Sequence, residues 1–226
     1  MKRNIKKLPT RRRKALTRLG WILGIVAFLS VFRLYYFLPS QALYEAEERQ
    51  NIGRTEVVIL EKGLDLEFTT ASRMYLSVWE DTVLLTGMRF RPLTGWDSGP
   101  VVCRDLPAEE PVSGYAWTPY GVEGRSFALG YVCVDDPAIT TADIRLQGVR
   151  AWDSQKGEWT REDVFRIQSE ASEWTESGGR RYLLLNREVE WPEELEWGPF
   201  YMVVTAFDAQ GNVVAEYDSY WADWIG

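Results

Sequence analysis

Carboxylates are the most abundant side chains in this sequence that could do acid–base chemistry. The 226 residues include 33 Asp or Glu and no His. The lack of His removes the most common general base and metal ligand and excludes Ser-His-Asp and Cys-His triads. A glycosidase needs two carboxyls about 5–9.5 Å apart, and this many acids meet that spacing by chance. The acids that cluster in sequence are Glu45, Glu47 and Glu48; Asp135 and Asp136; and Glu193, Glu194 and Glu196. A solvated acidic surface is the favoured interpretation, and no catalytic residue is predicted.

Sequence motifs for metal or nucleotide binding are missing. Asp135, Asp136 and Asp143 lie in one stretch that could hold calcium, but the spacing of an EF-hand does not occur. The glycine-rich loops that cradle phosphates, GxxxxGK and GxGxxG, do not occur either. We therefore predict no metal ion and no cofactor.

Aromatic side chains offer a different chemistry, which is stacking on a sugar or on a protein surface. The chain has 11 Trp and 11 Tyr. Four aromatic residues gather near the C-terminus: Tyr217, Tyr220, Trp221 and Trp224. Two interpretations stay open. Either these rings form an exposed contact patch for a carbohydrate or protein partner, or this end of the chain packs back over the edge of the domain.

Charge divides the chain into two parts of opposite sign. Residues 1–39 carry ten Lys or Arg and no acid. Residues 40–226 carry 16 Lys or Arg against 33 Asp or Glu, which leaves a formal charge of −17. Such an acidic domain repels nucleic acids and anionic polymers, so no nucleic-acid partner is expected.

An apolar segment follows the basic tail of residues 1–18. Residues 19–38 contain one charge, Arg33, and a helix of twenty residues covers about 30 Å, the thickness of a hydrocarbon core. Arg33 lies near the outer end, where its side chain can snorkel to the interface. We predict a transmembrane helix over residues 19–38 with the lipid bilayer as its partner. The positive-inside rule keeps the basic tail in the cytoplasm and sends the C-terminus outside, so the chain is expected to be a single-pass protein of the cell membrane.

This segment is either an uncleaved signal-anchor or a cleaved signal peptide. Small residues at Ser40 and Ala42 suit a signal peptidase. The apolar stretch is longer than the 7–15 or so residues of an ordinary signal peptide, and Arg33 interrupts the approach to the cleavage site. The anchor is therefore favoured, and either fate delivers the rest of the chain outside the cytoplasm.

Export bears on Cys103 and Cys133, the two cysteines of the chain. An oxidising compartment permits a disulfide between them. Closing a loop of about 30 residues would stabilise the fold by about 3–4 kcal/mol. We predict this disulfide, and the alternative is two buried thiols in neighbouring strands.

The remaining residues divide into a short leading segment and one β-rich domain. Residues 39–54 are rich in helix formers and are predicted to be a short helix or stalk ending at Gly53. From residue 55 to 226 short β-branched and aromatic runs alternate with Gly, Pro and Asp turns. This pattern predicts an antiparallel β-sandwich. The predicted strands are 55–60, 64–69 (after a turn at 62–63), 74–79, 82–90, 101–103, 126–134, 143–152, 181–185, 200–207 and 212–217. Residues 91–125 are expected to be rich in turns, and 162–170 has a helical pattern.

Two stretches resemble known extracytoplasmic domains. The hairpin Tyr201–Tyr217 contains Ala-Phe-Asp-Ala-Gln-Gly-Asn between two apolar runs, and it resembles the final hairpin of bacterial immunoglobulin-like or fibronectin-like domains. The stretch Gly130–Ile139, with Asp-Asp-Pro-Ala-Ile at its end, looks like a pattern in membrane-anchored extracytoplasmic proteins of Gram-positive bacteria. Together they cover about 45 residues and consist of turn chemistry. The resemblance implies an immunoglobulin-like sandwich and carries no catalytic residues.

These observations favour a non-enzymatic, membrane-anchored domain that binds a protein or a component of the cell envelope. Two alternatives stay open. One is a hydrolase of cell-wall glycan that uses paired carboxylates. The other is a scaffold for envelope assembly or division, which would share the layout of a short basic tail, one span and an outer domain.

Overall fold

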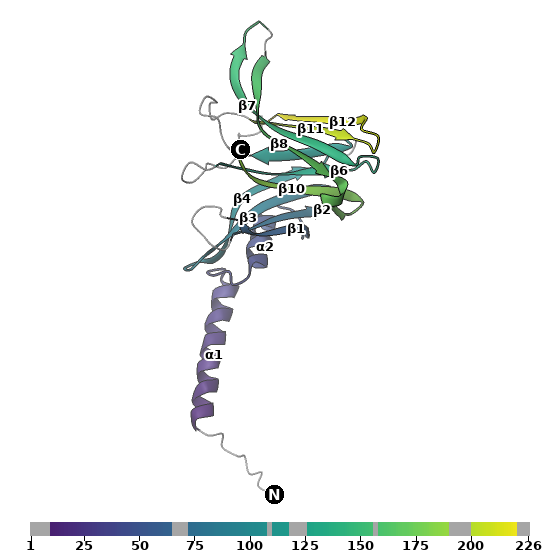
Figure 1. Cartoon of the computed structure of the whole chain (residues 1–226). Helices are drawn as coiled ribbons and strands as arrows, with labels where there is room; N and C mark the ends of the chain where they lie inside the picture. Colours follow the sequence, from purple (N-terminus) through teal and green to yellow (C-terminus); the bar gives the residue numbers. More distant parts are fainter. Residues whose placement is uncertain are drawn as a thin grey trace.

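The structure is a computed structural model that shows two helices followed by stacked β-sheets (Figure 1). It describes residues 10–64, 72–107, 110–117, 126–155, 158–189 and 200–220. Helix α1 (Thr10–Val31) projects alone from one end of the molecule, and helix α2 (Pro39–Arg49) lies against the first sheet. The chain is mainly β, as predicted.

Helix α1 stops at Val31, seven residues before the predicted end of the span at Leu38. Arg33 adopts the left-handed conformation with φ 53°. The Arg33 amide donates to the Ser30 carbonyl (3.1 Å) and the Leu34 amide donates to the Leu29 carbonyl (2.9 Å). These two bonds form a Schellman motif, which satisfies the last carbonyls of the helix and turns the chain away. The prediction of a continuous helix over 19–38 was therefore wrong, because Arg33 occupies a position that glycine usually marks.

Residues 39–49 form the short helix α2, one face of which is buried. Pro39 stands at its first position, where a missing amide hydrogen costs nothing, and the Leu38 amide donates to Oε1 of Gln41 (3.0 Å). Asn51, with φ 55°, follows the helix and turns the chain toward the first strand. The predicted stop at Gly53 thus lies two residues too late.

Three four-stranded antiparallel sheets contain the strands of the described residues. Sheet A has the order β1 (Glu56–Leu64), β2 (Ser72–Trp79), β3 (Thr82–Arg91) and β4 (Gly95–Asp105). Sheet B has the order β5 (Val112–Trp117), β6 (Ser126–Val134), β10 (Arg180–Val189) and β9 (Thr175–Ser177). Sheet C has the order β12 (Val213–Tyr220), β11 (Phe200–Phe207), β7 (Thr141–Asp153) and β8 (Glu158–Glu170), and a short 3-10 turn, η1 (Ala171–Glu173), links β8 to β9.

Sheet B is the middle layer of the stack. One of its faces packs against sheet A through a cluster that includes Leu129 and Leu85, and the other packs against sheet C through a cluster that includes Val132 and Ile144. Because side chains alternate along a strand, β6 must be apolar on both faces, and residues 128–134 are all buried. The opposite face of sheet A packs against α2. The layers therefore run α2, sheet A, sheet B, sheet C (Figure 1).

This arrangement has three sheets where the predicted sandwich had two, and the immunoglobulin-like form is not confirmed. Several local predictions are confirmed. The hairpin around Glu80-Asp81 forms with Trp79 opposite Thr82, Trp152 lies opposite Trp159, and β11 pairs with β12. In the last hairpin Asp208 accepts hydrogen bonds from the Gln210 and Asn212 amides, and Gly211 has φ 82°.

Other local predictions were wrong. Residues 162–170 belong to strand β8, where a bulge opposite Leu146 and Gln147 lets the adjacent Val164 and Phe165 both pack on the core. That bulge disturbs the strand alternation and imitates a helical pattern. Strand β1 continues through the turn predicted at 62–63, and the predicted strand 64–69 lies outside the described residues after Leu64. The turn-rich segment 91–125 contains β4 and β5.

Candidate functional site: the junction after helix α1

Helix α1 exposes an apolar surface to its surroundings. Its segment Arg12–Val31 has a mean hydropathy of 1.5 and none of it is buried against the rest of the chain; in the part of the chain that the structure describes, it is the one helix long and apolar enough to cross a membrane. Trp21, Ile25 and Phe28 are each more than half exposed. In water this surface would be costly, since each exposed Å² of apolar area forgoes about 25 cal/mol.

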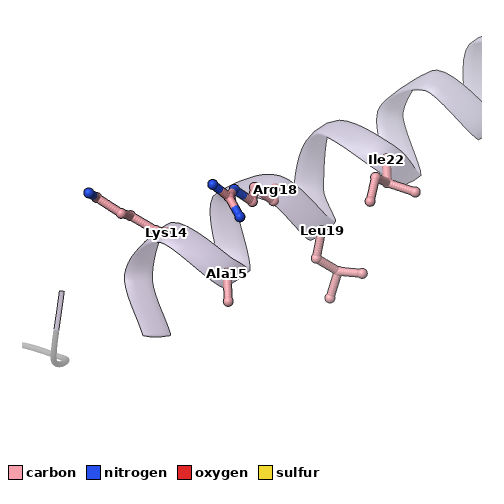
Figure 2. A pocket seen from close by; sticks show the side chains of 5 residues that line it. All are labelled: Lys14, Ala15, Arg18, Leu19 and Ile22. Atoms are coloured by element: carbon pink, nitrogen blue, oxygen red, sulfur yellow. The ribbon is translucent and has the colours of Figure 1, made fainter. Parts of the chain in front are cut away.

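The basic end of α1 changes to the apolar end within two turns. A shallow hollow on the side of the helix is lined by Lys14, Ala15, Arg18, Leu19 and Ile22 (Figure 2). Two cationic side chains, Lys14 and Arg18, lie at one end of this hollow, and the aliphatic Leu19 and Ile22 lie further along the helix. All five belong to one helix, so the hollow is not an enclosed cavity and has no acid–base group beyond its two cations. Its composition matches a helix that leaves a charged interface and enters hydrocarbon.

An ion pair fixes the point where the chain leaves α1. Nη1 and Nη2 of Arg33 donate to Oε2 and Oε1 of Glu48, at 2.6 and 3.1 Å. This forked geometry connects the end of α1 to helix α2. The hydrogen bonds from Arg33 lower the pKa of the Glu48 carboxyl. The pair therefore persists at neutral pH and is lost only as the pH falls through that lowered pKa.

The segment between the two helices is attached to sheet A. The Tyr36 amide donates to the Thr94 carbonyl (3.2 Å), and the Trp96 amide donates to the Tyr36 carbonyl (2.8 Å). Gly95, between these two partners, has φ 80°, and a Cβ at this position would collide with the Tyr36 carbonyl oxygen. Only glycine allows this close approach, so the segment is held by backbone contacts at the turn between β3 and β4.

Replacing Gly95 by Ala is expected to release this attachment. The side chain would meet both a strained backbone conformation and the Tyr36 carbonyl, and we expect a loss of about 2 kcal/mol of stability at the junction. Gly211→Ala is a matched control, because Gly211 has nearly the same φ, 82°, but open space around its Cβ. Amide hydrogen exchange should show faster exchange at Tyr36 and Trp96 in Gly95→Ala alone. Equal protection of these amides in both variants would mean that the close contact does not matter.

Glu47 connects α2 to the first strand and is the buried acid of this junction, with 1% of its surface exposed. Its Oε1 accepts hydrogen bonds from the Thr55 amide (2.9 Å) and the Thr55 hydroxyl (2.6 Å). Its Oε2 accepts a hydrogen bond from Nη1 of Arg54 (2.8 Å). From the sequence, Glu47 is grouped with Glu45 and Glu48 as a solvated acid. The signal for its burial is its spacing from Leu43 and Ala46, which places it on the buried face of α2.

The predicted disulfide is not formed, because Cys103 and Cys133 are both free and lie in different layers. Cys103 in β4 lies opposite Leu84 in β3. The two side chains pack together on the side of sheet A that faces α2. Cys133 belongs to the cluster between sheets A and B. The backbone of sheet A separates the two side chains. Burial raises the pKa of both thiols, to about 11 for Cys133, so both are protonated at neutral pH.

Reductant is therefore expected to leave the thermal midpoint of the protein unchanged. A disulfide would instead contribute about 3 kcal/mol that reduction removes. Thermal unfolding with and without dithiothreitol measures this difference. Alkylation after denaturation without reductant should modify both cysteines, as intact mass reports. A lower midpoint on reduction, together with failure to alkylate, would establish the disulfide instead.

The predicted aromatic patch is corrected at Tyr217. This side chain is partly buried against the core between sheets B and C, and its hydroxyl donates to the Gly114 carbonyl (2.9 Å). Burial raises the pKa of its hydroxyl. The backbone of Tyr220 lies opposite Tyr201 in β11. Trp221 and Trp224 lie outside the described residues, so only the role of Tyr217 as a free contact is overturned.

The carboxylates singled out in the sequence are held by arginines or by backbone. Asp135 and Asp81 both accept from Arg180, at 3.1 and 2.8 Å, and this connects sheet B to the turn between β2 and β3. Asp136 accepts from the Ala138 amide and Asp143 accepts from Nε of Arg166, both at 2.8 Å. Glu193, Glu194 and Glu196 lie outside the described residues. Among the residues with known positions, no three His, Cys, Asp or Glu side chains come together as a metal site would require.

No protein-family model matches this chain, and no curated protein does. The junction is defined as α1, residues 32–38, α2 and the turn between β3 and β4.

Proposed function

We propose that the chain is a single-pass membrane protein in which α1 anchors a β-rich domain outside the cytoplasm. The observation that carries this proposal is an apolar helix with no buried part, beside a well-packed stack of sheets. The basic residues before and within the first turns of α1 favour a cytoplasmic N-terminus under the positive-inside rule. The resemblance to extracytoplasmic proteins of Gram-positive bacteria supports the same compartment.

The junction supports an anchor that stays attached. Cleavage near Ala42 would remove Tyr36 and its bonds to the turn between β3 and β4, and it would also remove Pro39 and the first turn of α2. Ala42 itself is fully buried against sheet A. The mass of the protein extracted from membranes tests this: we expect the tail of residues 1–18 to be present. A mature N-terminus close to residue 43 would establish a cleaved signal peptide.

We further propose that the domain is non-enzymatic and binds a protein or envelope component through the outer face of sheet C. In Figure 1 this sheet lies at the end opposite α1, and the β7–β8 hairpin projects beyond it. Its inner residues, such as Val204 and Ile144, pack on sheet B, so the alternate residues face away from the core. A surface placed furthest from the membrane is the one most available to a partner.

Ordered polar contacts on that face support recognition of a polar partner. The guanidinium of Arg161 stacks on the Tyr201 ring at 3.5 Å and pairs with Asp218 at 2.7 Å. Gln147 in β7 donates to Asp163 in the neighbouring β8 (2.7 Å). Fixed groups of both signs bind with less loss of side-chain entropy than mobile ones.

A photo-crosslinking amino acid placed on the full chain in cells tests this assignment. At Gln147 or Val203, on the outer face of sheet C, we expect one reproducible crosslinked species. Leu60, on the edge strand β1 of sheet A, is exposed and serves as the control position. Crosslinks of equal yield from Leu60, or none from either face, would remove sheet C as the binding surface.

A further inference from the structure

The uncharged part of α1 is shorter than a hydrocarbon core, although the whole helix is long enough to span one. From Leu19, which follows the last cation of the helix, to Val31 there are thirteen residues, which cover about 20 Å. A hydrocarbon core is about 30 Å thick. Snorkelling of Arg18 or local thinning of the bilayer can cover part of the difference. Apolar side chains beyond the end of the helix would extend the surface that faces hydrocarbon.

Exposed apolar side chains occur in the segment that follows α1 and in the turn to which this segment is attached. Phe32, Leu34 and Leu38 are each more than half exposed. Leu93, in the turn between β3 and β4, is 91% exposed, which is the highest value among the large apolar residues of the described chain. We name these four residues the exit collar. Ordinary surface apolar residues occur singly, whereas a group of exposed ones marks an interaction surface.

Leu93 joins this group through the backbone. The carbonyl of Thr94, the next residue, accepts from the Tyr36 amide, and Tyr36 follows the end of α1 by five residues, at most about 18 Å of chain. In Figure 1 the ends of β3 and β4 reach the level at which α1 stops. Leu93 therefore lies on the side of the domain where the helix emerges.

Cations accompany the exit collar. Arg91 precedes Leu93 by two residues and has a half-exposed side chain, and Arg33 lies between Phe32 and Leu34. Each cation also pairs with a carboxylate, Arg91 with Asp97 at 3.4 Å and Arg33 with Glu48 at 2.6 Å. Apolar side chains flanked by guanidinium groups are the composition of surfaces that lie at the boundary between lipid headgroups and acyl chains.

We propose that the exit collar inserts into the outer leaflet, so that the domain rests on the membrane through the turn between β3 and β4. The ligand is the lipid bilayer itself, with acyl chains around Leu93 and phosphate groups near Arg91. This inference rests on the proposed membrane span, because the collar continues the surface of α1. It fixes the orientation of the domain and directs sheet C away from the membrane.

Fluorophore depth in vesicles tests the proposal. The full chain, with Cys103→Ala and Cys133→Ala, is reconstituted into phosphatidylcholine–phosphatidylglycerol vesicles after labelling a single new cysteine with an environment-sensitive dye. Leu93→Cys probes the collar, Val213→Cys is the exposed control on β12, and Leu23→Cys reports on the span. We expect a lipid carrying a shallow nitroxide to quench the dye at Leu93 at least about two-fold more than the dye at Val213.

The three probes separate the outcomes. Quenching at Leu23 by a deep nitroxide but none at Leu93 would overturn the exit collar and leave the membrane span intact. Absence of quenching at both Leu23 and Leu93 would overturn the span and the collar together. Equal quenching at Leu93 and Val213 would mean that the domain contacts lipid without a preferred face, which also contradicts the proposal.

Discussion

A chain carrying Ile25→Asp and Phe28→Asp is expected to leave the membrane fraction. Each acid placed near the centre of a spanning helix costs about 2.5–3.5 kcal/mol on insertion scales, so the pair lowers the inserted fraction by more than about 1,000-fold. Both side chains are more than half exposed, so the change removes little packing beyond the contact of the Phe28 ring with the Phe32 ring. Carbonate extraction and sedimentation of cell membranes measure the result.

Two control variants separate the loss of apolar character in α1 from the effect of added charge. Ile25→Leu with Phe28→Leu keeps α1 apolar and should stay in the carbonate-resistant pellet. Val213→Asp with Val214→Asp adds the same charge on the exposed strand β12 and should stay there too. If the α1 double-Asp variant remained in the pellet beside these controls, the helix would not be the anchor.

Glu47→Ala is expected to be the most destabilising single change at the junction. It leaves the partly buried Thr55 amide and hydroxyl without their acceptor and opens space under α2. An unsatisfied buried donor costs about 1–3 kcal/mol and the lost contacts add to it, so we expect a decrease of about 3 kcal/mol in the free energy of unfolding. Urea unfolding of the full chain in detergent, followed by tryptophan fluorescence, measures this change.

The neighbouring Glu48 provides the matched control. Its pair with Arg33 is half exposed, and exposed pairs contribute less than about 1 kcal/mol. Glu48→Ala should therefore cost much less than Glu47→Ala, and Glu47→Gln, which keeps one acceptor oxygen, should lie between them. Equal costs for Glu47→Ala and Glu48→Ala would show that the buried carboxylate does not hold α2 to β1.

Local signals in the sequence predict local structure well. The basic tail followed by apolar residues predicts α1, and the turn residues at Glu80-Asp81 and at Asp208–Asn212 predict two hairpins that the structure contains. The end of α1 could not be predicted in the same way, since Arg33 stands where glycine is the usual signal. The full length of strand β4 was not predicted because it contains Pro100. An edge strand tolerates proline, and the pairing of β4 with β3 is irregular at this point.

The layering of the sheets depends on contacts between distant segments. Sheet B pairs β6 with β10 across the whole of the β7–β8 hairpin, and turn residues carry no information about that pairing. One signal was present: the apolar run of β6 lacks alternation, which is typical of a strand buried on both faces. The disulfide prediction failed for the same reason, because which face of sheet A each cysteine occupies depends on the stack. Glu47 and Leu93 likewise acquire their roles only from the packing of α2 and from the turn at Gly95.

Protease accessibility in intact spheroplasts tests the central claim most directly. An epitope placed after Gly226 and a second one placed before Met1 report the two sides of α1 in one chain. The proposed topology predicts that added protease removes the C-terminal epitope and leaves the N-terminal epitope intact until the membrane is permeabilised. A C-terminal epitope that survives in intact spheroplasts, in a chain that sediments with membranes, would contradict it.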